Sequence, residues 1–249
     1  EFFYRLLYNH CRLVYSPQPL VEHDNWMERA EFVRHMKVAI RVQAAVFTAY
    51  AQAPEKPSPL RTLQPVKNFV TVTDQTIRAP KAEDWVFYRG NYQAWGWSAL
   101  DQISTRNVKN LQLVWSRAME PGINQATPLV YNGVMYLGNP GDVIQAIDAA
   151  SGDLMWQYRH PLPETTDMRN QLGQRKRTVA LYGDNVYTVT WDNHVLALDA
   201  RTGAKVWETD RGGDLYVSNS SGPIVANGVV MAGSTCQYSG YGCYVTGHD

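Results

Sequence analysis

The stretch AIDAASGDLMW (residues 146–156) returns as ALDARTGAKVW (residues 197–207), and both fit Ala-x-Asp-x-x-(Ser/Thr)-Gly-x-x-x-Trp without a gap. The two copies begin 51 residues apart, and Gly247-x-Asp249 matches the opening of a third copy. Self-similarity at a fixed period of about 20–50 residues is the signature of repeat architectures. The phrase therefore predicts a repeated structural unit.

A hairpin signal precedes each copy of the phrase. Asn132-Gly133 and Asn227-Gly228 each separate two short apolar runs, and Gly183-Asp184-Asn185 does the same in the middle repeat. Asn-Gly between β-prone runs is the strongest short hairpin signal, because both turn residues tolerate positive φ. Four short strands in each repeat are typical of a β-propeller. The regular spacing argues against the alternative, a β-sandwich with coincidental turns.

The phrase itself has a mechanical interpretation. The Asp199 carboxylate is expected to accept hydrogen bonds from turn amides, and Gly203 to take a left-handed conformation. Trp156 and Trp207 then lie on outer strands, where each indole can wedge between adjacent blades and donate its N–H to a carbonyl. The fold predicted is all-β: antiparallel blades joined by tryptophan docking.

The length of the chain limits the number of blades that it can form. Residues 84–249 have room for about three blades, whereas closed propellers have about 4 to 8. The chain is therefore expected either to be part of a larger propeller or to close with partners. Because the third repeat breaks off, we favour a fragment.

The segments before the propeller are assigned from composition. Residues 36–53 read as a signal peptide, with basic residues, an apolar core and an Ala51-x-Ala53 cleavage site. The alternative is an amphipathic helix that begins near Asp24. Residues 1–35 are either upstream sequence or a small accessory helix, and 54–83 form a proline-rich N-terminal arm. Export to the periplasm is the expectation.

Charge and cysteine content exclude some classes of protein. The chain has 23 basic and 23 acidic residues, and no basic run or patch suggests nucleic acid, so we expect no nucleic-acid partner. No stretch is long enough for a transmembrane helix. None of the three cysteines has CxxC or zinc-finger spacing. Cys236 and Cys243 are predicted to form a local disulfide in the exported protein.

The repeated phrase resembles the tryptophan-docking motif of the pyrroloquinoline quinone (PQQ) dehydrogenases, which are eight-bladed propellers. The segments LQLVWSRAMEPGINQATPLVYNGVMYLGNPGDVIQAIDA (111–149) and NSSGPIVANGVVMAGSTCQYSGYGCYVTGHD (219–249) resemble the sorbose/sorbosone branch of periplasmic quinoprotein alcohol dehydrogenases. The resemblance covers residues 84–249, roughly the first third of a full-length member. It implies a partial eight-bladed propeller that binds PQQ and Ca²⁺, oxidises an alcohol or a sugar-like substrate, and passes electrons to a cytochrome c.

The resemblance nominates three cofactor-binding positions that precede hairpins. Gln125 stands where the family has a Glu, so it keeps hydrogen-bonding capacity without the charge. Arg177 matches a family Arg whose forked guanidinium suits the paired oxygens of PQQ. Ser220 stands in place of a Thr. The structural alternatives are a turn residue for Gln125 and a surface ion pair for Arg177, whereas Arg175 and Lys176 are interpreted as solvated charges.

A fourth stretch departs from the family pattern. Many members have Ser-Gly-Ala-Glu where this chain has Thr235-Cys236-Gln237-Tyr238. The first three are predicted to lie at the cofactor, but Tyr238 replaces the metal-binding Glu, and a neutral phenol is a poor ligand for Ca²⁺. Either Gln237 supplies an amide oxygen, or the metal ligands come from residues beyond 249.

No acid in the chain is nominated as the catalytic base, because the family's Asp falls beyond residue 249. Asp142 and Asp192 are interpreted as turn carboxylates, and His194 as a satisfied edge histidine. The chain alone is expected to be inactive. The alternative function is a non-catalytic scaffold of the outer-membrane assembly type, whose lipoproteins carry a Cys after the signal peptide; here Pro54 follows Ala53.

Overall fold

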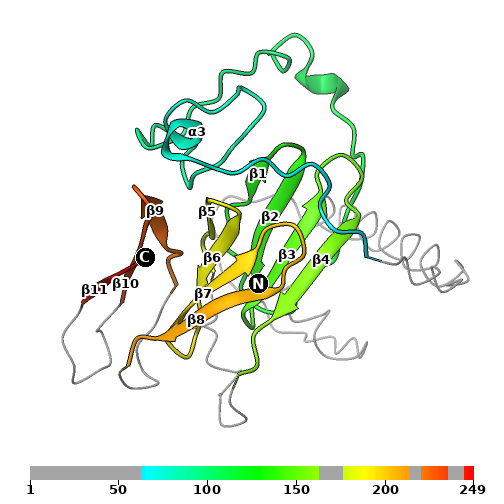
Figure 1. Ribbon diagram of the computed structural model, residues 1–249. Helices are drawn as coiled ribbons and strands as arrows, with labels where there is room; N and C mark the ends of the chain where they lie inside the picture. The colour runs from blue at the N-terminus through cyan, green and yellow to red at the C-terminus, as the bar shows by residue number, and fades with distance from the viewer. Residues whose placement is uncertain (1–62, 163–175, 213–219, 235–243) are drawn as a thin grey trace, which may run out of the picture. The chain divides into compact units, whose positions relative to one another are not determined.

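The computed structural model describes residues 63–162, 176–212, 220–234 and 244–249, which contain three antiparallel sheets (Figure 1). The first has the order β1-β2-β3-β4, the second β5-β6-β7-β8, and the third β9-β10-β11. Helix α3 (Asp74–Arg78) has five residues, and one 3₁₀ turn spans Val108–Asn110. The all-β prediction is confirmed. The strands are β1 Leu129–Tyr131, β2 Val134–Asn139, β3 Val143–Asp148, β4 Leu154–Arg159, β5 Ala180–Tyr182, β6 Asn185–Val189, β7 His194–Asp199, β8 Lys205–Asp210, β9 Ile224–Ala226, β10 Val229–Gly233 and β11 Val245–His248.

The three predicted hairpins are confirmed. β1 pairs with β2, β5 with β6 and β9 with β10, each across the turn that the sequence marked. Asn132 and Gly133 have φ values of 49° and 77°, and Asn227 and Gly228 have 51° and 81°. Both residues of each Asn-Gly pair therefore take the positive φ that this kind of hairpin turn requires.

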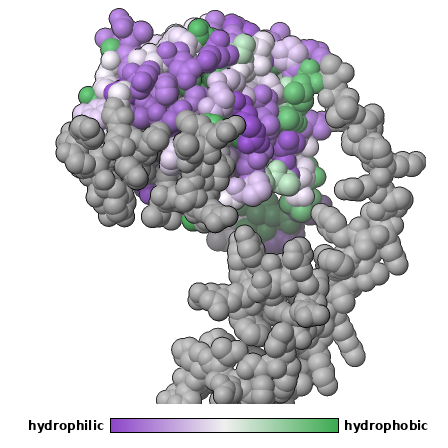
Figure 2. Space-filling model, turned by 90° about the horizontal axis from the view of Figure 1, so that it is seen from below, coloured by the Kyte–Doolittle hydropathy of each residue, from purple (hydrophilic) through white to green (hydrophobic). Residues whose placement is uncertain are grey.

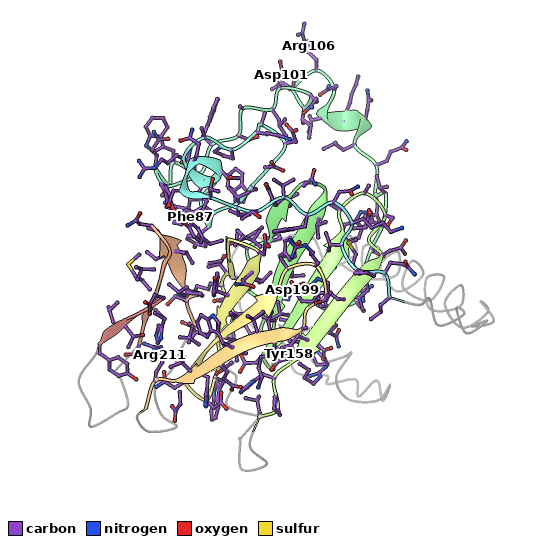
Figure 3. The ribbon with its side chains drawn as sticks, viewed as in Figure 1. Phe87, Asp101, Arg106, Tyr158, Asp199 and Arg211 are labelled. Carbon is purple, nitrogen blue, oxygen red and sulfur yellow. The ribbon has the colours of Figure 1, made fainter. Side chains whose placement is uncertain are left out.

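The Asp of each phrase closes the turn between the two outer strands. Asp148 Oδ1 accepts hydrogen bonds from the second and third amides after it, at 2.9 and 2.8 Å. Asp199, labelled in Figure 3, accepts the equivalent two bonds at 3.0 and 2.9 Å. A β-bulge precedes the Asp in both sheets. The predicted role of this residue is confirmed.

The tryptophans join one sheet to the next. Trp156, on β4, is 3% exposed, and its Nε1 donates to the Ala200 carbonyl of the second sheet at 3.0 Å. Trp115 makes the same bond to Ala149 of the first sheet at 3.1 Å. Trp207, on β8, is half-buried and stacks on the His248 ring of the third sheet, 6.4 Å between centroids. Docking between adjacent blades is thus confirmed for Trp156, and Trp207 faces the next sheet.

Gly203 of the phrase supports this docking in two ways. Its φ is +72°, and a Cβ there would lie 2.5 Å from a ring carbon of Trp156. We expect Gly203→Ala to destabilise the protein by about 2–4 kcal/mol, the sum of left-handed strain and overpacking. Gly133→Ala is the matched control, because Gly133 has φ +77° and no atom within 4 Å of a Cβ.

Gly133→Ala adds only backbone strain, so it should lower the free energy of unfolding by only about 1–2 kcal/mol. Urea unfolding of the two variants measures the difference. Equal losses of stability would contradict close packing of the indole on Gly203.

The chain before the blades packs into the same core. Val66, Val72 and Ile77 are buried with residues of the first two sheets. Asp74 accepts hydrogen bonds from the Asn227 amide, the Tyr92 hydroxyl and the Tyr182 hydroxyl at 2.7–2.8 Å, and these bonds, the Asn227 amide first, lower the pKa of its carboxyl. The arm therefore ties the second and third sheets together. The predicted signal peptide and residues 1–35 lie outside the described residues.

Arg211, which follows β8, connects the second sheet with the third (Figure 3). Its guanidinium donates to the Ala232 carbonyl at 2.9 Å and to Thr246 Oγ at 3.0 Å. Burial lowers the pKa of this guanidinium, which is nevertheless charged at neutral pH. The three sheets are thus linked by ring docking, by the Asp74 carboxylate of the arm and by Arg211.

Hydrophobic side chains remain exposed ahead of the first sheet. Trp95, Trp97 and Leu113 are 77%, 72% and 84% exposed. By contrast, the described surface that Figure 2 shows is mainly hydrophilic, with hydrophobic side chains in limited areas. Among the described residues, no helix has the length and apolar character needed to cross a bilayer.

Candidate functional site

Three segments that lead into the first strands of the sheets lie side by side. The Thr127 amide, just before β1, donates to the Arg177 carbonyl at 2.7 Å. The Arg177 amide, before β5, in turn donates to the Ser220 carbonyl, before β9, at 3.1 Å. Two backbone hydrogen bonds thus connect all three sheets at equivalent points of the repeat.

This arrangement gathers three of the predicted cofactor-binding residues. Arg177 and Ser220 are bonded directly, and Gln125 lies two residues before Thr127. The Arg177 and Gln125 side chains are exposed, and that of Ser220 is half-buried. Across the described ranges, no acidic side chain pairs with the Arg177 guanidinium. The surface ion pair that was the structural alternative for Arg177 is therefore not seen there.

The donor set has a clear chemical character. A guanidinium fork, a hydroxyl and a primary amide can all donate hydrogen bonds, and only the guanidinium carries a charge. Such a set suits a planar, anionic ligand with paired oxygens. None of the three positions carries a carboxylate, which Ca²⁺ prefers. These three side chains thus fit an oxygen-rich anion, and none of them supplies a carboxylate for Ca²⁺.

The prediction that Lys176 is a solvated charge is wrong. Its side chain is 2% exposed, and Nζ lies 2.5 Å from both the Asp142 Oδ1 atom and the Val189 carbonyl oxygen. Neighbours in an extended segment point to opposite sides, so Lys176 is buried while Arg177 is exposed. The run Arg175–Arg177 reads as surface charge, and nothing local in the sequence shows which residue turns inward.

Asp142 is a turn carboxylate, as predicted, but it is buried rather than solvated. It lies between β2 and β3 with φ 53°, and its side chain is 2% exposed. Besides the ion pair with Lys176, its Oδ2 accepts the Trp191 amide of the second sheet at 2.6 Å. A charge can be buried in this way because it is both paired and hydrogen-bonded.

The remaining predicted residues cannot be placed. Thr235, Cys236, Gln237, Tyr238 and Cys243 lie outside the described residues. Their predicted contacts with a cofactor, and the predicted disulfide, remain predictions.

Comparisons with known proteins find similar chains over most of the described residues. A family model described as outer membrane protein assembly factor BamB matches residues 101–246. The quinohemoprotein alcohol dehydrogenase of Comamonas testosteroni is 34% identical over 175 residues, 69% of this chain and 25% of that protein. The 1-butanol dehydrogenase (cytochrome c) of Thauera butanivorans is 34% identical over 156 residues, 61% of this chain and 23% of that protein.

A solved structure of one of these relatives has a similar fold. The crystal structure of the Comamonas testosteroni enzyme matches with a TM-score of 0.63 and 32% identity, over 72% of this chain and 27% of that one. The chain belongs to the PQQ-dependent quinoprotein alcohol dehydrogenase family. The sheets of this chain are blades of a β-propeller, as predicted. The chain spans about a quarter of the length of the two curated relatives.

Proposed function

We propose that this quinoprotein chain forms part of a PQQ-dependent dehydrogenase that oxidises an alcohol, and that Gln125, Arg177 and Ser220 face the cofactor. The observation that carries the proposal is the pair of backbone hydrogen bonds that connects Thr127, Arg177 and Ser220. These bonds bring together the backbone segments of three successive blades that carry the donor residues, which supports a ligand that spans several blades.

The three residues have distinct proposed roles. Bound PQQ supplies a quinone that accepts the electron pair removed from the alcohol. Arg177 donates two parallel hydrogen bonds to adjacent oxygens and balances negative charge. Ser220 contributes a hydroxyl donor, and Gln125 a neutral amide that can donate or accept. Ca²⁺ belongs to the proposal only for the whole protein, with ligands outside the described residues.

Substrate, electron acceptor and location rest on the resemblance. The name of the 1-butanol dehydrogenase includes cytochrome c, which supports a cytochrome c-type acceptor here as well. Alcohols are the substrates named for the curated relatives, and a sugar-like substrate of the sorbose type stays a prediction. Periplasmic export is proposed from residues 36–53.

A non-catalytic scaffold is the second candidate, and one finding favours it. The family model that matches residues 101–246 takes its description from an outer-membrane assembly factor. Both dehydrogenases named above match a longer stretch, over 175 and 156 residues, and each is 34% identical to this chain there. The whole protein, supplied with PQQ and Ca²⁺, should reduce an artificial dye when a primary alcohol is added; no reduction would favour the scaffold.

Arg177→Lys is expected to weaken PQQ binding roughly ten- to a hundredfold while the fold stays intact. Loss of a charge-assisted hydrogen bond costs about 1.5–3 kcal/mol, and each 1.4 kcal/mol is about tenfold in affinity. Lys keeps the charge, so this loss would report the geometry of the fork. Cofactor titration of the whole apo-protein measures it.

The matched control is Arg159→Lys, because Arg159 is 52% exposed and pairs with Glu120 at 2.8 Å. It should leave PQQ affinity unchanged. If Arg177→Lys and Arg177→Ala both bind PQQ as the unmodified protein does, Arg177 is not part of the cofactor site.

A further inference from the structure

Two histidines and one aspartate meet where the end of β4 approaches the turn between β6 and β7. His160 Nε2 lies 3.0 and 2.9 Å from the two oxygens of Asp192. His194 Nδ1 lies 3.2 Å from Asp192 Oδ1. One ligand atom from each of the three residues falls within 4.8 Å of the other two. We call these residues the His-Asp-His cluster.

The cluster is largely enclosed but open on one side. The side chains of His160 and Asp192 are 3% and 9% exposed, and that of His194 is 25% exposed. An ion can therefore approach the Asp192 carboxylate past His194.

Two polar atoms of the cluster lack hydrogen-bond partners. Within the described part of the chain, the Nδ1 atoms of His160 and His194 are buried and make no hydrogen bond. Buried polar side-chain atoms in folded proteins are rarely left without partners. The His194 Nδ1 atom faces the Asp192 carboxylate closely, but without hydrogen-bond geometry. This is the arrangement expected if His194 Nδ1 and the Asp192 carboxylate bind a shared cation.

The surroundings of His160 favour the same interpretation. Its Nδ1 lies 3.9 Å from Glu208 Oε1, which is too far for a hydrogen bond. If Nε2 carries the only proton of the ring, the Nδ1 lone pair faces this carboxylate. If Nε2 binds a metal, Nδ1 carries the proton and points its N–H toward Glu208. Metal-binding histidines usually present their second N–H to a carboxylate in this way.

We propose that the His-Asp-His cluster binds one divalent transition-metal ion, with Zn²⁺ the best match. Two imidazoles and one carboxylate are a ligand set found in Zn²⁺ sites, with metal–ligand distances of about 2.0–2.2 Å. Ligands at such distances lie on the order of 3–3.5 Å from each other, which matches the contacts with Asp192. Ca²⁺ and Mg²⁺ prefer all-oxygen sites, so imidazoles disfavour them.

The ion would connect two blades. His160 directly follows β4 of the first sheet, whereas Asp192 and His194 belong to the second. The Thr190 hydroxyl donates to Asp192 Oδ1 at 2.5 Å and so orients the carboxylate. The site differs from the cofactor positions and contains none of them. Its role is to hold the first and second blades together.

The test uses the full chain without PQQ or Ca²⁺, so that its outcome does not depend on the proposed function. After treatment with a chelator, Co²⁺ is titrated as a spectroscopic probe of the site. We expect one Co²⁺ per chain with visible absorption, displaced by Zn²⁺, and a higher unfolding temperature with Zn²⁺. No binding of either metal below millimolar concentration would overturn the proposal.

Three variants identify the ligands. His194 is the most exposed of the three cluster residues, so it is the first one changed. His194→Gln removes a metal ligand and should reduce Co²⁺ affinity by more than the roughly 10- to 100-fold that is typical when a hydrogen-bond partner of a ligand is removed. Glu208→Gln removes the carboxylate that faces His160 Nδ1, and its loss of Co²⁺ affinity should be about 10- to 100-fold. His248→Gln is the control, because His248 lies in the third sheet and bonds Thr246 Oγ at 2.9 Å.

His248→Gln should bind Co²⁺ as the unmodified chain does. Circular dichroism checks that each variant is folded, and a misfolded His194→Gln is replaced by Asp192→Asn. If His194→Gln, or Asp192→Asn in its place, keeps the stoichiometry and affinity of the unmodified chain, the metal binds elsewhere and the proposal is wrong.

Discussion

Trp156→Ala should destabilise the protein by about 3–5 kcal/mol, the typical effect of removing a fully buried tryptophan ring. The indole is 3% exposed and fills the space between the first and second sheets, beside Tyr136 and over Gly203. Truncation leaves a cavity that neither sheet can close without moving as a whole. The midpoint of urea unfolding measures the effect.

Two further variants separate the causes. Trp97→Ala removes an indole that is 72% exposed, and should change stability by no more than about 0.5 kcal/mol. Trp156→Phe keeps a ring but loses the Nε1–H donor to the Ala200 carbonyl. That carbonyl also accepts the Tyr136 hydroxyl at 3.1 Å, so it stays satisfied, and the loss should be well below that of Trp156→Ala. Equal effects of Trp156→Ala and Trp97→Ala would refute blade docking.

Lys176→Met should cost about 3–5 kcal/mol, because it leaves the Asp142 carboxylate buried without its cation. Both side chains are 2% exposed, and their charged atoms lie 2.5 Å apart. The double variant Lys176→Met/Asp142→Asn removes both charges, and the Asn oxygen can still accept the Trp191 amide. It should recover much of the lost stability. Unfolding of the single and double variants gives the coupling energy directly.

The control for this pair is Lys205→Met. Lys205 is 46% exposed and pairs with Glu208 at 2.5 Å on the surface of β8. Exposed pairs contribute about 0–1 kcal/mol, so this variant should be nearly neutral. Comparable losses in Lys176→Met and Lys205→Met would mean that burial of the Lys176 pair has no energetic importance.

Features that depend on neighbouring residues were predictable from the sequence. Asn132-Gly133 and Asn227-Gly228 specify their hairpins, because few other residues adopt two successive positive φ values. The Asp, Gly and Trp of the phrase are recognisable for a similar reason. Asp199 closes a turn over the next three residues. Glycine is the only residue type that fits beneath the Trp156 indole at position 203, where φ is positive.

The candidate cofactor site was predictable only in part. Arg177 and Ser220 were nominated by resemblance, and the structure brings their segments together through one backbone hydrogen bond. Nothing in the local sequence shows that the segments are adjacent, because they belong to different blades. The spacing of the repeat predicts that the Arg177 and Ser220 segments are adjacent only once the blades are known to be arranged side by side.

The amino-acid sequence by itself determined the repeat, its hairpins and the docking role of Trp156, because each depends on contacts within one repeat or between equivalent positions of two. Only the tertiary structure decided which charges are buried. Lys176 pairs with Asp142, and His160 with Asp192, across separations of more than thirty residues. The physical reason is that desolvation depends on the surrounding sheets, so a basic residue in a charged run and a lone histidine acquire their environment only when two blades pack together.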